Sequence, residues 1–459
     1  MIPAGTTIYS GFTGPITGPN GAFWGTGDGG AVQYYLANIP RAFQVPQENW
    51  FYSTPFSGGP VLVYGPRLSG NARAIGSYLD QTCVVAFSDL DRVLTSLDLL
   101  NMANPNDPGP LSAAVNQLSP DRYGALPLII SHQHTLVLDA FGDRIAATRW
   151  PSSSSHMHQQ AIAPGLAIWG QAIGGFGRRG GAVTMPGYRT TAGGGIAGVD
   201  YRTNGFVFGL GAGFLASDVK WRDVGHSTGN IDTAVVGAYG GATFGPALLE
   251  GAVAATYSDI DVNRRIVVRG VELIGLNRQP DPGSFRFSTA VDRTALGRAD
   301  ALGFAARLDL GTELRLATAR FKPFVGLSYG TIDREAFVER GAGAVSLRVT
   351  DQVSDGLHSR LGALLSYDIA DLGPLAISLQ GRLVWSHRLS AFSGSVTAGL
   401  IDQLGSFTVA TVREDQNALQ PGLAVVGRFN GGQVFARYGG DFREDLTAHT
   451  VMGGVTLRF

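Results

Sequence analysis

Two short histidine pairs are the residues whose type and spacing could do chemistry in this sequence. The segments at 131–134 and 155–158 read Ser-His-Gln-His and Ser-His-Met-His, and imidazole is a common metal ligand. Neither pair is accompanied by a cysteine or carboxylate cluster, and residues two apart on a helix point in different directions. We therefore interpret both pairs as polar histidines and assign no metal site.

A glycine-rich stretch at 25–30 looks superficially like a phosphate-binding loop. It reads Gly-Thr-Gly-Asp-Gly-Gly, but it lacks the lysine, the hydroxyl residue and the following helix that hold a phosphate. Residues 1–110 are also too poor in motifs to display an active site. We assign no catalytic residue and no cofactor, and we expect the chain not to be an enzyme.

Composition favours a chain of strands and turns over an ordinary soluble domain. The 459 residues include 65 glycines and 24 phenylalanines, and only 15% are charged, against about 25% in soluble domains. The net charge of −1 gives no indication of nucleic-acid binding. Cys83 is the single cysteine, so no intrachain disulfide can form. No stretch approaches the ~18 consecutive apolar residues of a transmembrane helix.

Strands dominate the sequence from about residue 160 onward. Apolar residues there alternate with polar or very small ones, as they do on the two faces of a strand, and turn residues separate the segments. In the last segment Val451, Gly453, Val455, Leu457 and Phe459 share one face, and Met452, Gly454, Thr456 and Arg458 share the other.

A soluble sandwich would alternate in the same way, but two details favour a membrane barrel. The apolar faces are often nine or more residues long, which suits a tilted strand that crosses a bilayer. Aromatic residues gather near strand ends, as in the girdles of outer-membrane barrels. The opposite faces carry charges that we predict to face the lumen: Glu250, Arg307, Asp309, Arg360, Arg382, Arg428, Arg437 and Arg458.

The sequence therefore predicts an all-β transmembrane barrel of about twelve antiparallel strands. Short turns and longer loops alternate between the strands, and the longest loops are expected around 262–293 and 391–417. We expect strands near 165–175, 192–202, 205–217, 230–244, 246–260, 294–309, 321–337, 355–369, 374–390, 418–429, 431–441 and 447–459.

These strands resemble the autotransporter β-domain, the translocator of type V secretion. The resemblance rests on Gly-Ile-Ala-Gly-Val-Asp-Tyr-Arg at 195–202, Lys-Pro-Phe-Val-Gly-Leu-Ser-Tyr at 322–329, the segments 206–217 and 357–367, and the terminal Val-Thr-Leu-Arg-Phe. It implies an outer-membrane protein that anchors and exports an N-terminal passenger to the cell surface. Implied partners are outer-membrane lipid, the barrel assembly machinery, periplasmic chaperones and the passenger itself. The family's assembly signal falls on Phe459, with Leu457 and Val455 on the same face.

Upstream, 71–75 and 111–123 resemble the α-helical linker of the same family. Ser119 is a good N-cap, Pro120 suits a first helical position and Asp121 complements the helix dipole. Gly124 and Pro127 then interrupt, so we expect a kink or a second helix that starts near Pro127 and continues to Arg149. The resemblance implies that a linker helix threads the pore. The expected division is a short passenger-like β region at 1–70, a helical linker at 71–159 and the barrel at 160–459.

Three functions compete at this stage. An outer-membrane porin or transport barrel would share the strands but needs an open pore, and the linker argues against it. A surface adhesin or an enzyme would have its activity in a passenger that is truncated here. Some relatives cleave their passenger with a linker asparagine and lumenal acids, for which Asn116 and Glu250 or Asp309 are candidates, but no spacing singles them out.

The start of the sequence predicts that the chain is incomplete. An exported barrel requires a cleavable signal, with a basic start and an apolar run. The first residues, Met-Ile-Pro-Ala-Gly-Thr, show neither. We therefore expect a misplaced start codon, a gene fragment or a pseudogene-like remnant that kept the translocator, with the rest of any passenger upstream of Met1.

Overall fold

The computed structural model describes most of the chain from residue 63 onward. The described residues are 63–82, 84, 88–104, 106–149, 165–181, 185–269, 272–274, 286–288, 290–316, 319–373, 375–390 and 394–459. The predicted passenger-like region, apart from 63–70, lies outside them. So do Cys83 and the histidine pair at 155–158.

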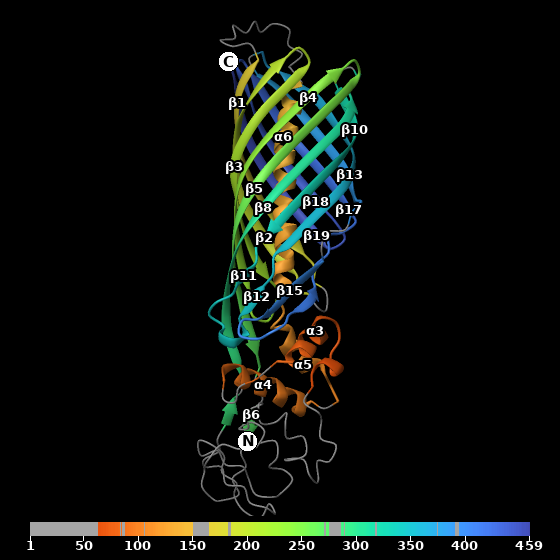
Figure 1. Ribbon diagram of the computed structural model, residues 1–459. Coiled ribbons are helices and arrows are strands. Elements are labelled where there is room, and N and C mark those ends of the chain that lie inside the picture. The colour runs from red at the N-terminus through yellow and green to blue at the C-terminus, as the bar shows by residue number, and fades with distance from the viewer. Residues whose placement is uncertain are drawn as a thin grey trace, which may run out of the picture.

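A closed antiparallel barrel is the largest part of the fold (Figure 1). One sheet of 13 strands contains it, and without the three-residue β9 (Leu314–Leu316) twelve long strands remain. Neighbours in the barrel are sequence neighbours, and the sheet closes where β1 pairs with β19. The predicted all-β barrel of about twelve strands is confirmed. The strands are β1 (Leu166–Arg179), β2 (Tyr188–Thr203), β3 (Phe206–Trp221), β4 (Thr228–Phe244), β5 (Ala247–Val268), β8 (Val291–Thr312), β10 (Ala319–Arg334), β13 (Gln352–Asp371), β14 (Leu375–Arg388), β17 (Asn417–Phe429), β18 (Gly432–Phe442) and β19 (Leu446–Arg458).

The two ends of the barrel differ in their connections. At one end, here the turn end, strands are joined by short turns such as Asn204–Gly205, both at positive φ. At the other, here the loop end, the long connections carry elements of their own. These are the hairpin β6 (Glu272–Ile274) and β7 (Arg286–Ser288), the 3₁₀ turn η5 (Gly343–Val345), and a four-stranded sheet of β11 (Phe337–Val338), β12 (Leu347–Val349), β15 (Ser395–Leu400) and β16 (Phe407–Ala410).

An apolar band covers the outside of the wall, and β5 shows where it stops. Leu249, Val253 and Tyr257 point outward and are exposed, whereas the next outward position is Asp259. The strand nevertheless continues to Val268, well past the expected end at 260.

The alternation changes phase at this point, which explains the error in the predicted boundary. Beyond the band the apolar residues point inward, and Ile260, Val262 and Ile266 are buried while their outward neighbours are polar. The expectation followed outward apolar residues only, so the extension of β5 beyond residue 261 and the first three residues of β8 were expected to belong to a loop.

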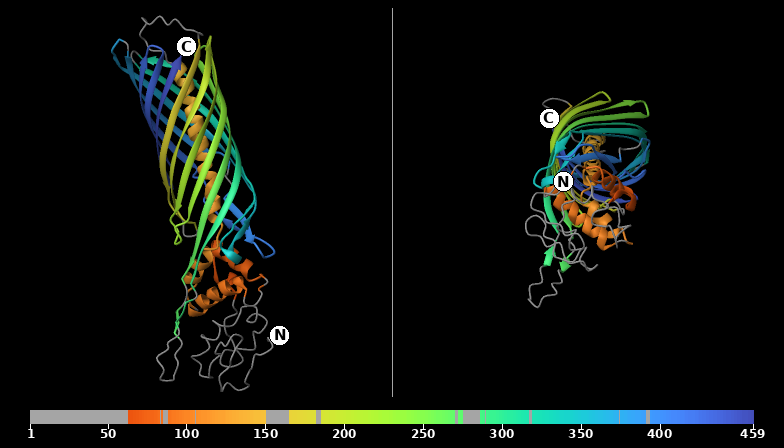
Figure 2. Two further views of the ribbon diagram at one scale, coloured as in Figure 1. Left: turned by 90° about the vertical axis from the view of Figure 1, so that its left-hand side faces the viewer. Right: turned by 60° about the horizontal axis from the view of Figure 1, so that its bottom comes forward.

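The helices form two groups (Figures 1 and 2). Outside the loop end lie η3 (Gly65–Arg67), α3 (Gly70–Leu79), α4 (Asp89–Ala103) and α5 (Gly109–Asn116). We call these, together with β11, β12, β15 and β16, the cap. Its apolar core includes Leu94, Leu97 and Leu347 and is continuous with the inward faces of the β5 and β8 extensions.

The second group leads into the barrel. The 3₁₀ helix η4 (Asp121–Ala125) is followed by α6 (Leu126–Arg149), which runs through the lumen. The expected new helix near Pro127 is confirmed, since Pro127 is the second residue of α6. Ser119 Oγ accepts a hydrogen bond from the Asp121 amide at 3.3 Å, although the residue directly before η4 is Pro120. Among the described helices, none is both long and apolar enough to cross a bilayer.

Candidate functional site

The lumen holds α6, and one face of this helix packs on β1 to β5. Phe141 lies at the centre of that face, fully buried, with its ring 5.1 Å from that of Tyr239. The wall opposite is glycine: a Cβ at Gly211 or Gly237 would lie 2.7 or 2.5 Å from the Phe141 ring. The very small inward residues of β3 and β4 therefore make room for the helix.

The other face of α6 carries acids that meet the predicted lumenal arginines. Asp139 Oδ1 lies 2.7 Å from Arg307 Nη1 and 2.8 Å from Arg382 Nη2. Asp143 forms an ion pair with Arg437. Two carboxylates four residues apart on one helix thus bind three arginines from three different strands.

The remaining predicted lumenal charges also lie inside the barrel. Arg458 Nη2 donates to the carbonyl of Ala147 near the end of α6, at 3.4 Å. Other partners lie on the wall itself: Asp309 pairs with Arg360 at 2.8 Å, Glu250 with Lys322 at 2.5 Å, and Arg428 donates to Ser378 Oγ at 3.0 Å.

A second set of contacts holds α6 near the turn end. Arg144 pairs with Asp200 on β2 and donates to Thr456 Oγ1 on β19 at 2.7 Å. Tyr239 also donates to Asp200, at 3.0 Å, and itself accepts from Trp169 Nε1 at 2.6 Å. Sequence reasoning overlooked the charged residues of α6. The available signal was the spacing of Asp139, Asp143 and Arg144 within the second half of α6, where the residues between them are apolar or glycine.

The first histidine pair does not converge on a common point. His134 Nε2 lies 2.8 Å from Thr256 Oγ1, while His132 Nδ1 lies 3.9 Å from a carboxylate oxygen of Asp441. Asn116 ends α5 in the cap, so it is not on the helix that fills the lumen. Three spaces beside α6, of about 50, 40 and 30 Å³, each have room for only a few waters.

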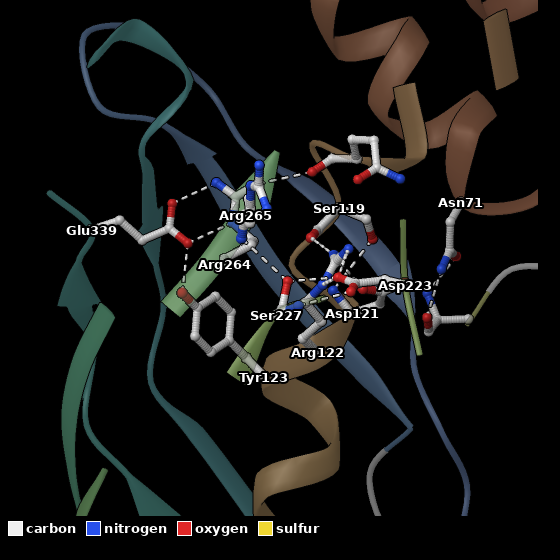
Figure 3. A network of polar contacts seen from close by, with 12 residues as sticks. Asn71, Ser119, Asp121, Arg122, Tyr123, Asp223, Ser227, Arg264, Arg265 and Glu339 are labelled. Atoms are coloured by element: carbon white, nitrogen blue, oxygen red, sulfur yellow. Dashed lines mark hydrogen bonds and ion pairs between the residues drawn. The ribbon is translucent and has the colours of Figure 1, made fainter. Parts of the chain in front are cut away.

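A buried ion-pair network at the loop end holds the joint between α5 and α6 (Figure 3). We call Arg122, Tyr123, Asp223, Arg264 and Glu339 the clasp. Arg264, on the β5 extension, donates to both carboxylate oxygens of Glu339 at 2.7 and 2.6 Å, and both side chains are fully buried. Tyr123 donates to the same carboxylate at 2.5 Å.

The Arg264–Glu339 pair is hydrogen-bonded on every side. Arg264 also donates to the carbonyls of Gln117 and Val345, both at 3.0 Å, and Glu339 accepts from the Leu347 amide at 2.8 Å. Burial, and then the neighbouring Glu339 carboxylate, raise the pKa of Tyr123 well above its ordinary value. The phenol therefore stays protonated and serves as a donor.

The other half of the clasp joins Arg122 to Asp223 in the β3–β4 loop, at 2.6 Å. Burial would raise the pKa of Asp223, but the Arg122 charge and two hydrogen bonds from Ser227 hold it below its ordinary value. A Gly-x-Ser-x-Gly pattern occurs here, at Gly225–Gly229, as at the nucleophile of many hydrolases. Its Ser227 is 1% exposed, donates to Asp223 and accepts from the Arg265 amide. The hydroxyl therefore holds the β3–β4 loop against β5.

The geometry defines a transmembrane β-barrel whose pore is occupied by a helix of its own chain. The outer wall is apolar, the backbone is paired all around the sheet, and the lumen is lined by charges. Such walls suit a lipid environment, in which backbone groups cannot bond to solvent.

The chain belongs to the autotransporter β-domain family, whose model matches residues 168–439. Autotransporter β-domains are outer-membrane translocators rather than enzymes. Because outer-membrane barrels have short periplasmic turns and longer extracellular loops, the loop end, with the cap, is the extracellular end. No curated protein matches the sequence.

Among solved structures, the translocator domain of autotransporter NalP from Neisseria meningitidis aligns with a TM-score of 0.54 at 16% identity. The alignment covers 74% of this chain and 100% of that chain. The β domain of the Bordetella autotransporter Brka aligns with a TM-score of 0.43 at 14% identity, covering 64% of this chain and 100% of that chain. The likeness to NalP supports the barrel fold.

Replacing Glu339 with glutamine should loosen the clasp. Arg264 would keep its charge in a fully buried site without a compensating carboxylate, which costs about 3–5 kcal/mol. We expect amide hydrogen exchange in residues 117–125 to accelerate by roughly a hundredfold or more. Asp292→Asn is the matched control, because its partner Arg265 is the next residue of β5 but points to solvent. Equal, small effects of the two substitutions would contradict a structural role for the clasp.

The joint should also depend on pH through Asp121. Burial raises the pKa of Asp121 to about 6, against the opposing charge of Arg122. The folded carboxyl binds a proton more tightly than the unfolded one, so the contribution of Asp121 to the stability of the joint is greatest below about pH 4. This contribution should fall by on the order of 3 kcal/mol as the pH rises to about 6, and it should then level off. Asp121→Asn should abolish this decline, measured as the ratio of exchange rates at residues 119–125 in variant and wild type at each pH. A constant ratio from pH 4 to 7 would refute it.

Proposed function

We propose that this chain is the membrane anchor and translocator of an autotransporter, which exports an N-terminal passenger to the cell surface. The observation that carries the proposal is the path of the chain. The described residues between 63 and 118 lie outside the loop end, α6 passes through the lumen, and β1 begins at the turn end (Figure 2). A chain that has crossed the barrel from the periplasm would finish in this arrangement.

The contacts of α6 favour a translocator over an open porin. Phe141 is seated against glycines, and Asp139 and Asp143 bind arginines of the wall. A helix held this firmly blocks the path that a solute would take. An adhesive or enzymatic activity would belong to passenger residues outside the described structure.

Surface labelling of intact cells tests the export. A peptide epitope at the N-terminus should bind antibody on intact cells, because the passenger side is extracellular. The same epitope inserted between Asn204 and Gly205, in a turn at the opposite end, should bind only after the outer membrane is permeabilised. An N-terminal epitope that needs permeabilisation would overturn the proposal. A large open conductance of the intact chain in planar bilayers would favour a porin instead.

We also propose that Phe459 is a signal for the barrel assembly machinery, reached with the help of periplasmic chaperones. Val455, Leu457 and Phe459 form an exposed apolar row on the outer wall, 43%, 47% and 37% accessible. The Phe459 amide donates to the carbonyl of Leu166 at 3.0 Å, so this row borders the seam where the sheet closes. An insertion machine that acts at the seam would meet these side chains, and membrane lipid would cover them afterwards.

Phe459→Ala should leave the protein degraded or aggregated in the periplasm. Phe429→Ala is the matched control, because Phe429 has the same exposure, 36%, at the same end of the wall. Removing an aromatic from the girdle alone should affect both variants equally. Membrane-fraction yield and heat-modifiable migration on gels measure the outcome, and similar yields of the two variants would count against a signal.

A further inference from the structure

Three basic side chains stand in a row across the outer wall at the loop end. Arg178 on β1 is paired in register with Arg189 on β2, and Arg189 is paired with Lys220 on β3. All three are exposed. Direct cross-strand neighbours have Cβ atoms about 4.5–5.5 Å apart, and like charges in such pairs destabilise a sheet. We call these three residues the basic row.

On β1 the basic row begins directly above the apolar band. On β1 the outward positions run from Leu166 to Phe176, about the 9–11 residues that a tilted strand needs to cross the hydrocarbon. Arg178 is the next outward position. Arg178 therefore lies at the level of the lipid head groups on the extracellular side. On β2 and β3 one polar outward position, Thr191 or Asp218, comes between the band and the row, and the long side chains of Arg189 and Lys220 can span it.

The members of the row are not in ion pairs within the part of the chain that the structure describes. No ion pair or side-chain hydrogen bond joins any of its three members to a described residue. Asp218, one outward position from Lys220, instead accepts from Asn230 on the far side, at 3.3 Å. Other exposed arginines of the wall are paired: Arg265 with Asp292 at 2.7 Å and Arg298 with Asp261 at 2.8 Å.

The neighbouring sector of the wall has the opposite charge. Asp232, Asp259 and Asp300 are paired in register across β4, β5 and β8. A continuous row of outward basic residues is thus present on β1 to β3, whereas the corresponding row on β4, β5 and β8 is acidic. An anion would be attracted to one sector only.

We propose that the basic row binds lipid head groups that carry phosphate and a net negative charge, in the outer leaflet of the membrane. The position of the row favours a lipid over a soluble anion. The wall beneath the row is covered by the hydrocarbon chains of lipids, and the head groups of these lipids lie within reach of the row. A phosphate bridging two members would offset their mutual repulsion, and arginine suits phosphate by its bidentate geometry. This lipid contact rests on the outer-membrane location and is independent of the export function.

Native mass spectrometry of the full chain, purified in an uncharged maltoside detergent, tests this binding. The probes are bisphosphorylated lipid A, the same lipid without phosphates, phosphatidylcholine and inorganic phosphate. We expect wild type to retain only the bisphosphorylated lipid. The variant R178Q/R189Q/K220Q should bind it about fivefold more weakly per charge removed, roughly a hundredfold in total. The control variant R265Q/R298Q, whose arginines already have partners, should bind like wild type.

Heat-modifiable migration first establishes that each variant is folded. If the triple variant does not fold, the single substitution Arg189→Gln, at the centre of the row, replaces it, and about fivefold weaker binding is expected. Undiminished binding by the folded variant would overturn the proposal. Equal retention of the lipid without phosphates would also overturn it, as would displacement by equimolar inorganic phosphate, which would identify a site for free anions.

Discussion

Closure of the sheet is the constraint on which the rest of this structure depends. Inside a bilayer an unpaired backbone amide or carbonyl has no water to bond with, so a sheet can span it only if its two edges pair. Here the edges are β1 and β19, joined in register from Ala167–Arg458 to Arg179–Leu446. Closing about twelve tilted strands leaves a lumen wide enough for more than side chains, and α6 fills it. The choice of residues on each face follows: apolar toward lipid, small or charged toward the helix.

The way α6 is held reflects the cost of burying charge. Asp139 alone in a narrow lumen would be strongly destabilising, but two arginines surround it. Their mutual repulsion is in turn offset by the carboxylate. Buried pairs of this kind add little to stability against apolar alternatives, yet each is costly to break from one side. The pairs therefore fix the position of the helix in the lumen more than they stabilise the barrel. Phe141, seated over Gly211 and Gly237, fixes its rotation.

Period-two alternation was sufficient to predict the barrel, because every spanning strand has lipid on one face. Each of the twelve expected segments overlaps an observed strand. The same rule failed on the extension of β5, where water replaces lipid outside and Ile260 and Val262 point inward. The clasp could not be predicted at all. It unites Arg122, Asp223, Arg264 and Glu339, which lie on four separate segments, and no local pattern marks residues that meet only after the barrel has closed. The lumenal arginines could be located by their strand face, but their partners on α6 could not.

Beyond the membrane the apolar residues of β5 point inward, and they form part of the core of the cap. The free energy of folding the cap is therefore gained on the loop-end side of the membrane only. The apolar core of the cap is built jointly from Leu94 and Leu97 upstream of α6 and from Ile260, Val262 and Ile266 on the strand extensions. That core can assemble only where both parts are present, in water beyond the loop end. A segment that reaches this side through the lumen would bury Leu94 and Leu97 in this core. Moving back through the lumen would then cost free energy, because these side chains would first have to be exposed again. Under the proposed export function, folding of the cap on one side of the membrane would bias random motion through the pore in the outward direction, without nucleotide hydrolysis.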